Sequence, residues 1–375
     1  MNIPFNKSHF TGQEINYIQQ CFDTGKTSGD GSFTKKVAAF FDEKYGFKKA
    51  LFTTSCTDAL ELSALLLDIK PGDEIIVPSY TFVSTVNPFL LRGATIRFAD
   101  SHFDSPNVAI ASIKKLLNRN TKAIVVMHYG GIACEMDEIL ALAASFNCPV
   151  IEDAAQCINA FYNEKPLGSM GVLGTISFHD TKNISAGEGG LLVVNDAKYA
   201  ARAEILREKG TNRAAFFRGE VDKYGWVDVG SSFLGADLNA AMLYAQLQEI
   251  EQIHSKRAAI WQVYYHKLQF LIDKGVLLPA ISEKTNHNSH IFYIVANSLE
   301  ERQSLIKHLN DRGVGSAFHY GSLHKSAYFA DKYKGEPLPN SEKFADCLLR
   351  LPLFVALTEA EQDYIIEQIT DFYDR

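Results

Sequence analysis

Three stretches of the sequence carry side chains that could do chemistry together. Lys182 lies in SFHDTKNISAGEGG, between an apolar run and a cluster of glycines. Asp153 ends the apolar run VIED, and Ser55 to Asp58 follow the apolar run ALFT. A lysine in a turn is most often solvated, because lysines are rarely buried without a partner. The elements around Lys182 therefore decide whether it is a surface lysine or a reactive amine.

Short apolar runs alternate with helical segments through the first two-thirds of the chain. The strand-like runs are 49–55, 73–79, 121–131 and 148–153, and the helical segments after them are 56–69, 81–93, 135–146 and 154–157. Strand, loop and helix in this repeated order predict an α/β fold with a mostly parallel sheet. Ligands of such sheets bind outside the carboxyl ends of the strands. We therefore expect the loops at 54–57, 78–82, 128–131 and 153–156 to share one edge.

The residues before Lys182 indicate a further strand. Ile176 and Phe178 alternate with Ser177 and His179, which is typical of a strand with one buried face. The glycines then mark a sharp turn before the apolar run LLVVND. Lys182 is thus predicted in a turn at the end of a strand.

The chain of 375 residues is long enough for two domains. From residue 250 onward, apolar residues recur at helical spacing as far as Gly275, which predicts a long linking helix. The strand-like runs SHIFYIVA and GVGSAFHY follow, with helical segments, over about a hundred residues. We predict a large α/β domain over 1–250 and a small α+β domain over 251–375.

Composition limits the classes of function. The formal net charge of −7 argues against general nucleic-acid binding, although a small anionic substrate needs only a few local donors. No apolar run approaches membrane-spanning length, and the N-terminal residues lack the apolar core of a signal peptide. The six cysteines form no CxxC pair or metal-ligand spacing. We expect no metal site and reduced thiols in a cytoplasmic protein.

Two of the three stretches have a structural as well as a functional interpretation. Ser55 and Asp58 fit a capping box, yet the free N–H groups of a helix start also bind phosphate. Asp153 could cap the following turn or hold a positively charged ring nitrogen. A phosphate cradle, a strand-end carboxylate and a lysine in a strand-end turn are together the minimal set for pyridoxal phosphate.

The segment VIEDAAQ followed by SFHDTKNISAGEGG resembles the sugar aminotransferases of the DegT/DnrJ/EryC1/StrS family, which have the aspartate aminotransferase (type I) fold. Further segments are most similar to members that make dTDP-4-amino-4,6-dideoxygalactose: PGDEIIVPSYTFVSTVNPFLLRGA, HYGGIACEMDEI, REKGTNRAAFFRGEVDKYGWVDVGSS and LLRLPLF. The resemblance implies a pyridoxal-phosphate enzyme that moves an amino group from L-glutamate to the C4 ketone of dTDP-4-dehydro-6-deoxy-D-glucose. The product would serve cell-surface polysaccharide synthesis.

Three alternatives stay open beside this activity. The same machinery serves C4 amination to the gluco epimer or amination at C3. A sugar dehydratase of the same fold would have histidine where this chain has Lys182. A non-catalytic binding or regulatory protein could also keep the fold.

The resemblance implies roles for matched residues around the cofactor ring. Lys182 would form the Schiff base with pyridoxal phosphate and act as general base after its release. Asp153 would pair with the ring nitrogen, and Gln156 would bond the phenolic oxygen. Phe82 would stack on the ring, and the alternative is an ordinary core phenylalanine.

The resemblance also implies how the cofactor's phosphate is held. Ser177 and the backbone amides of Cys56 and Thr57 would bind it. Many members of the family add an asparagine from the second subunit, where this chain has Ser232. A homodimer with shared active sites follows from the family.

Substrate contacts are expected in two further segments. Lys209, Arg213 and Arg218 offer cations for the sugar diphosphate, and a solvated charged loop is the alternative. His319, Tyr320 and His324 are candidates in the C-terminal part.

Overall fold

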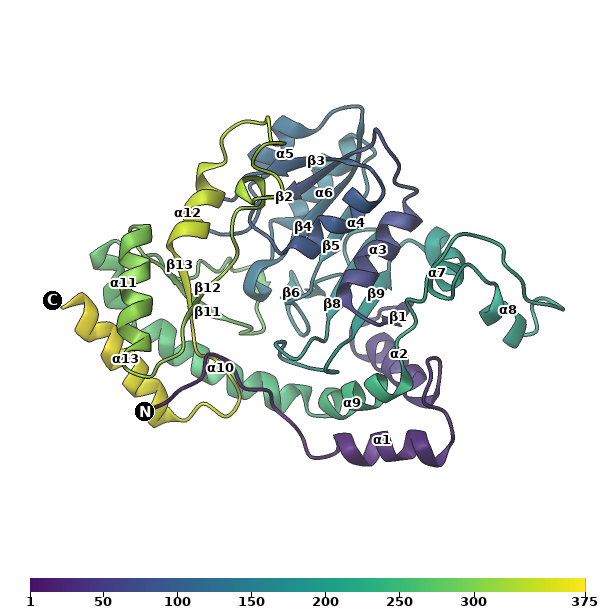
Figure 1. Cartoon of the computed structure of the whole chain (residues 1–375), viewed down its shortest axis with the longest axis horizontal. Helices are drawn as coiled ribbons and strands as arrows, with labels where there is room; N and C mark the ends of the chain where they lie inside the picture. The colour runs from purple at the N-terminus through teal and green to yellow at the C-terminus, as the bar shows by residue number, and fades with distance from the viewer. Residues whose placement is uncertain (375) are drawn as a thin grey trace.

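The computed structural model describes residues 1–374, and its centre is a seven-stranded sheet in the order β1-β9-β8-β5-β4-β2-β3 (Figure 1). The strands are β1 (Ala50–Thr53), β2 (Glu74–Pro78), β3 (Thr95–Ala99), β4 (Thr121–Met127), β5 (Val150–Asp153), β8 (Leu173–Ser177) and β9 (Gly190–Val194). Strand β9 pairs antiparallel with β1 and β8, and the other pairings are parallel. The mostly parallel sheet is therefore as predicted.

This pairing decides where the loops after the strands lie. Strand β9 is antiparallel to both of its neighbours, β1 and β8, so β1 and β8 run in the same direction. Strands β2, β4 and β5 are joined to β8 by parallel pairings and run in that direction too. Their carboxyl ends consequently meet at one edge, and Lys182 follows β8 at that edge. The expected sharing of one edge by the four loops is confirmed.

Helices cover both faces of this sheet, because its strands are apolar on both sides. Neighbouring residues such as Ile75 and Ile76 enter opposite cores. One face packs against α2 (Ser32–Tyr45), α5 (Ile110–Leu116), α6 (Met136–Ser145) and α9 (Asp237–Gln248). The other packs against α3 (Cys56–Leu66), α4 (Asn87–Leu91) and α7 (Ala200–Arg207). Helix α1 (Glu14–Asp23) lies along α9 (Figure 1).

A second core forms around the C-terminal sheet, which has the order β11-β13-β12. Its strands are β11 (Phe292–Val295), β12 (Ala317–Phe318) and β13 (Leu348–Leu351). Helices α10 (Ile250–Lys267), α11 (Leu299–Asn310), α12 (Pro339–Cys347) and α13 (Glu359–Tyr373) accompany it. The division of the chain near residue 250 stays a prediction, and it falls at the start of α10.

The first residues of the chain pack with this C-terminal core. Ile3 is 1% exposed and belongs to the same apolar cluster as α10 and α13. Its N–H donates to Gly313 O at 2.7 Å, and its carbonyl accepts from Gly315 N–H at 2.9 Å. The N-terminal segment therefore joins the small sheet region, although the prediction placed it with the large domain (Figure 1).

Several predicted elements differ in detail. Residues 154–157 form turns and not a helix, because Asp153 accepts the Ala155 N–H and closes a local turn. The long helix ends at Lys267 and continues as a 3-10 helix, Gln269–Lys274, before Gly275 in the left-handed conformation. Three strands of two residues each form a further small sheet in the order β10-β6-β7: β6 (Phe161–Tyr162), β7 (Lys165–Pro166) and β10 (Thr285–Asn286). Within residues 1–374, none of the helices is both long and apolar enough to cross a membrane.

Candidate active site

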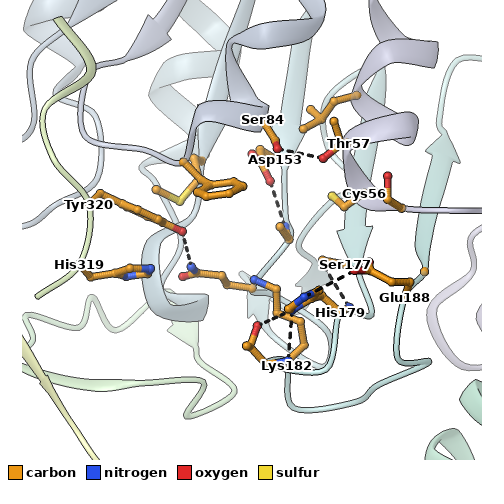
Figure 2. Close-up of a pocket in the computed structure, with 18 of the residues that line it drawn as sticks. Cys56, Thr57, Ser84, Asp153, Ser177, His179, Lys182, Glu188, His319 and Tyr320 are labelled. Atoms are coloured by element: carbon orange, nitrogen blue, oxygen red, sulfur yellow. Dashed lines mark hydrogen bonds and ion pairs between the residues drawn. The ribbon is translucent and has the colours of Figure 1, made fainter. Parts of the chain in front are cut away.

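A cavity of about 500 Å³ opens at the carboxyl edge of the large sheet (Figure 2). Its walls come from the loops after β1, β2, β5 and β8 and from the segment after β12. The predicted site residues that line it are Cys56, Thr57, Phe82, Asp153, Gln156, Ser177, Lys182, His319 and Tyr320. The fold thus brings together side chains from five separate segments.

Lys182 lies in the turn after β8, where its backbone N–H donates to His179 O at 2.9 Å. Its amine points into the cavity toward the end of β5 (Figure 2). Burial lowers the pKa of Lys182, and the nearby Cys56 and Asp153 oppose this shift. A lowered pKa increases the fraction of neutral amine, which is the nucleophilic form.

Asp153 is the last residue of β5, and its side chain is buried. Oδ2 accepts from the Thr85 hydroxyl at 2.7 Å, and Oδ1 accepts from the Ala155 N–H at 3.1 Å. Burial raises the pKa of Asp153, while these two hydrogen bonds and Lys182 favour the charged form. A buried carboxylate of this kind suits a positively charged ring nitrogen as its partner.

The start of α3 serves as both a cap and a source of free donors. Ser55 Oγ accepts the Asp58 N–H at 3.1 Å, which is one half of the predicted capping box, while the Asp58 carboxylate accepts from the Thr54 hydroxyl and not from the Ser55 N–H. The N–H groups of Cys56 and Thr57 belong to the first turn, where helix carbonyls cannot reach them. Both residues line the cavity, so their amides are available to an anion.

The strand β9 passes unusually close to this helix start. A Cβ atom on Gly190 would lie 2.3 Å from the carbonyl carbon of Ser55 and 2.4 Å from Cys56 N. Only glycine fits this approach, which explains one glycine of the cluster after Lys182. Ser177, at the end of β8, lines the same part of the cavity (Figure 2).

Phe82 is not a core residue. Its side chain is 53% exposed, and it lies at the N-terminal end of the 3-10 helix Val83–Thr85. Its ring centroid is 6.0 Å from that of Tyr320, across the cavity wall. An exposed ring at this position suits stacking on a planar ligand.

Gln156 is held from both sides. Its Oε1 accepts the Gly130 N–H at 2.6 Å, and its Nε2 donates to the Tyr320 hydroxyl at 2.9 Å. The dashed line that ends at the Tyr320 hydroxyl in Figure 2 marks the second bond. The amide has a second N–H, which leaves one donor for a ligand.

The C-terminal candidates separate in the structure. The ring of His319 lines the cavity, and its Nδ1 lies 2.9 Å from the Tyr129 hydroxyl. His324 is buried instead, with Nδ1 2.7 Å from Ser79 Oγ and Nε2 3.2 Å from Glu342. The structure therefore places His324 in a packing role outside the cavity.

The remaining candidates lie between α7 and α9, on a segment that projects from the body of the molecule with α8 (Arg213–Phe217) (Figure 1). Arg213 pairs with Glu208 at 3.0 Å, and Arg218 pairs with Glu204 at 2.9 Å. Lys209 and Ser232 are exposed on the same segment. None of these four residues lines the cavity of its own chain.

Sequence patterns missed several residues of the cavity. Thr85 supports Asp153, while Ser84, His179 and Glu188 line the walls. Ser84 and Thr85 lie just beyond the predicted edge loop 78–82, and their hydroxyl groups were the only feature of the sequence that could have indicated them.

Together the lysine, the carboxylate, the helix start and the exposed ring fit pyridoxal phosphate. Within residues 1–374, no group of three His, Cys, Asp or Glu side chains is placed to hold a metal ion.

Comparison with known proteins shows the family and the fold of this chain. The model of the DegT/DnrJ/EryC1/StrS aminotransferase family matches residues 9–370. Among solved structures, the aminotransferase TlmJ from Streptoalloteichus hindustanus is 26% identical, with a TM-score of 0.90 over 100% of this chain and 99% of that chain. DesV of S. venezuelae is 27% identical, with a TM-score of 0.90 and the same two coverages.

A third solved structure carries the cofactor in its name. The PLP-form of the putative sugar aminotransferase Spr1654 from Streptococcus pneumoniae is 24% identical and has a TM-score of 0.91 over 100% of this chain and 99% of that chain. The predicted α/β fold of the aspartate aminotransferase type is thereby confirmed. The chain belongs to the DegT/DnrJ/EryC1/StrS aminotransferase family.

Proposed function

We propose that this aminotransferase uses pyridoxal phosphate to move the amino group of L-glutamate to the C4 ketone of dTDP-4-dehydro-6-deoxy-D-glucose. The product is dTDP-4-amino-4,6-dideoxy-D-galactose, a precursor of cell-surface polysaccharide. The observation that carries the proposal is the meeting of Lys182, Asp153 and the start of α3 in one cavity. The sequence segments similar to enzymes that make this amino sugar support the choice of substrate.

The residues of the cavity divide the work between binding and proton transfer. When bound, pyridoxal phosphate supplies a ring that accepts electrons from a bond at the substrate carbon. Lys182 Nζ takes the proton from the α-carbon of glutamate and later delivers a proton to C4 of the sugar. Asp153 keeps the ring nitrogen protonated, and Phe82 covers one face of the ring.

The other contacts hold the cofactor and the substrates in place. The amides of Cys56 and Thr57, with Ser177, bind the phosphate, and Gln156 donates to the phenolic oxygen. His319 and Tyr320 line the cavity, where they would contact the sugar.

The active unit is a homodimer in this proposal. The segment between α7 and α9 exposes several large apolar side chains, and Trp226 is 83% exposed. Such a surface is costly in water and suits a partner subunit. Lys209, Arg213, Arg218 and Ser232 lie on this segment, so they reach the active site of the second subunit and not their own. The buried free thiols of all six cysteines support a cytoplasmic location.

The test follows both half-reactions by visible absorbance. Protein purified with pyridoxal phosphate should show the band of the lysine-bound cofactor, lose it with glutamate, and regain it with dTDP-4-dehydro-6-deoxyglucose. NMR of the product then distinguishes galacto from gluco configuration and C4 from C3 amination. Lys182→Ala should abolish the band and turnover. A mutant that aminates at the wild-type rate, or a wild-type protein with no turnover of any keto sugar, would refute the proposal.

A further inference from the structure

A second cavity of about 250 Å³ lies on the other side of Lys182. It shares four wall residues with the first cavity: Gln156, Thr181, Lys182 and His319. The rest of its wall includes Arg257, His290, Arg350, Asn6 and Phe5. We call this space the arginine cavity, and it opens beside the reacting amine.

Arg350 belongs to β13, between β11 and β12. One terminal nitrogen donates to Phe318 O at 3.4 Å, and the guanidinium carbon lies 4.6 Å from the centre of the Phe5 ring. Its Nε is buried without a hydrogen-bond partner in the described part of the chain. No carboxylate of residues 1–374 forms an ion pair with it. A buried guanidinium edge without a partner is costly, so this one is left free for an anion.

Arg257 adds a second positive charge from α10. Its side chain is 6% exposed, and its Nε and one terminal nitrogen donate to the carbonyls of Ser289 and His290. It also lacks an acidic partner among residues 1–374. Burial lowers the pKa of Arg257 to about 9, so it is still charged at neutral pH. Two arginines and no carboxylate thus line a small space.

Other charged groups do not cancel this potential. His290 Nδ1 lies 2.8 Å from Asn183 Oδ1, and burial lowers its pKa so that the ring is neutral. The charge of Arg350 also acts on Lys182, whose pKa is lowered first by burial. The arginine cavity is therefore a positive site within reach of the amine that does the chemistry.

We propose that the arginine cavity binds the carboxylate groups of a dicarboxylic amino-acid donor, with the free edge of Arg350 as the main contact. This inference rests on the proposed function and adds to it the residues that recognise the donor. The cavity has half the volume of the first one, which suits an amino acid better than a nucleotide diphosphate. Two cations favour glutamate over glutamine, because a neutral amide would leave one positive charge without a counter-charge.

Binding of an unreactive dicarboxylate tests the site without any turnover. Glutarate has both carboxylates and no amine, and its affinity for the cofactor-loaded protein is measured by titration calorimetry. We expect Arg350→Gln to weaken glutarate by about 10- to 100-fold, as for loss of a charged hydrogen bond. Arg350→Lys should retain part of the affinity. Arg312→Gln is the matched control, since Arg312 donates to His308 O and lies outside both cavities.

The two half-reactions then separate the donor from the sugar. Arg350→Gln should raise the glutamate concentration for half-maximal loss of the cofactor band by a similar factor, and reduce the preference for glutamate over glutamine. The half-reaction with the sugar nucleotide should stay near the wild-type rate. Equal glutarate binding in wild type and Arg350→Gln, or a loss confined to the sugar half-reaction, would overturn the inference.

These outcomes are distinct from failure of the proposed function. Glutarate binding that depends on Arg350, in a protein that aminates no sugar, would support the carboxylate site and refute the aminotransferase proposal. If Arg350→Gln does not change amination of the sugar by glutamate, the aminotransferase proposal is supported and the carboxylate site is refuted. Circular dichroism of each variant verifies that the small sheet has folded.

Discussion

Thr85 donates its hydroxyl hydrogen to Oδ2 of Asp153 at 2.7 Å, and both residues are buried. The Thr81 hydroxyl lies 2.7 Å from the Thr85 hydroxyl. Because Thr85 donates its only hydroxyl hydrogen to Asp153, Thr81 is the donor in this second bond. A short relay from the loop after β2 therefore fixes the carboxylate at the end of β5.

Thr85→Val should move the acidic side of the pH–activity profile upward. Burial raises the pKa of Asp153, and the Thr85 hydrogen bond opposes this by favouring the carboxylate. Without that bond the pKa rises further, so the charged form is lost at a higher pH as pH falls. We expect a shift of about one to two pH units, since a hydrogen bond to a charged group contributes roughly 1.5–3 kcal/mol. Thr370→Val, on α13, should leave the profile unchanged.

Phe82→Ala should weaken cofactor binding with little effect on folding. The ring is 53% exposed, so its removal leaves the apolar core intact. Loss of stacking on a planar ring should raise the dissociation constant of pyridoxal phosphate by roughly 2- to 10-fold. The dissociation constant is measured by fluorescence titration, and Phe82→Tyr should restore it. An unchanged constant in Phe82→Ala would exclude stacking.

Glu152→Ala should destabilise the protein strongly. The buried carboxylate accepts the N–H groups of Gly168, Met170 and Gly171 and faces His128 Nε2 at 3.1 Å. Removing it leaves several buried donors unpaired, which should lower the free energy of unfolding by roughly 3–5 kcal/mol. Denaturant unfolding followed by circular dichroism measures this change. Glu283→Ala, in an exposed loop, serves as the control and should stay within about 0.5 kcal/mol.

Mixing two variants with different defects tests the shared active sites. Lys182→Ala lacks the amine but keeps its projecting segment, and Arg213→Ala should have a raised Michaelis constant for the sugar nucleotide. A hybrid dimer has one site with an intact Lys182 and an intact Arg213 from the other subunit. Random mixing should therefore recover about one quarter of wild-type activity at low sugar concentration.

If Arg213 served its own subunit, no intact site would form and the mixture would gain nothing. Arg213→Ala with an unchanged Michaelis constant for the sugar nucleotide would remove this residue from the substrate site. Arg119→Ala, at an exposed position before β4, is a control for the loss of a surface charge.

Much of the site could be predicted because the topology of a parallel sheet determines where the residues after each strand lie. Parallel strands bring the ends of β1, β2, β5 and β8 to one edge, so residues just after apolar runs meet there. This argument located Lys182 and Asp153 without knowledge of any side-chain contact. It also located the start of α3, where the Ser55 cap and the free amides of the first turn occur together.

Residues that depend on contacts distant in sequence could not be predicted in this way. His324 is five residues from His319, yet it turns toward Ser79, just after β2, and is buried there. Arg350 lies on a strand of four residues, and no local pattern distinguishes a cavity-lining arginine from a surface one. Likewise, no local pattern shows that Gly313 and Gly315, just before the two-residue strand β12, bond to Ile3 near the other end of the chain.

The pairing of Ile3 with Gly313 and Gly315 has a consequence for synthesis on the ribosome. The large sheet is complete once β9 has emerged, since all seven of its strands lie before residue 195. The small core must wait for its third strand, β13, and meanwhile the first residues have no binding site. On the nascent chain, the segment around Ile3 therefore stays without its partners until Gly313, Gly315 and β13 have been synthesised. The last step in closing the small core joins two segments that are far apart in the sequence.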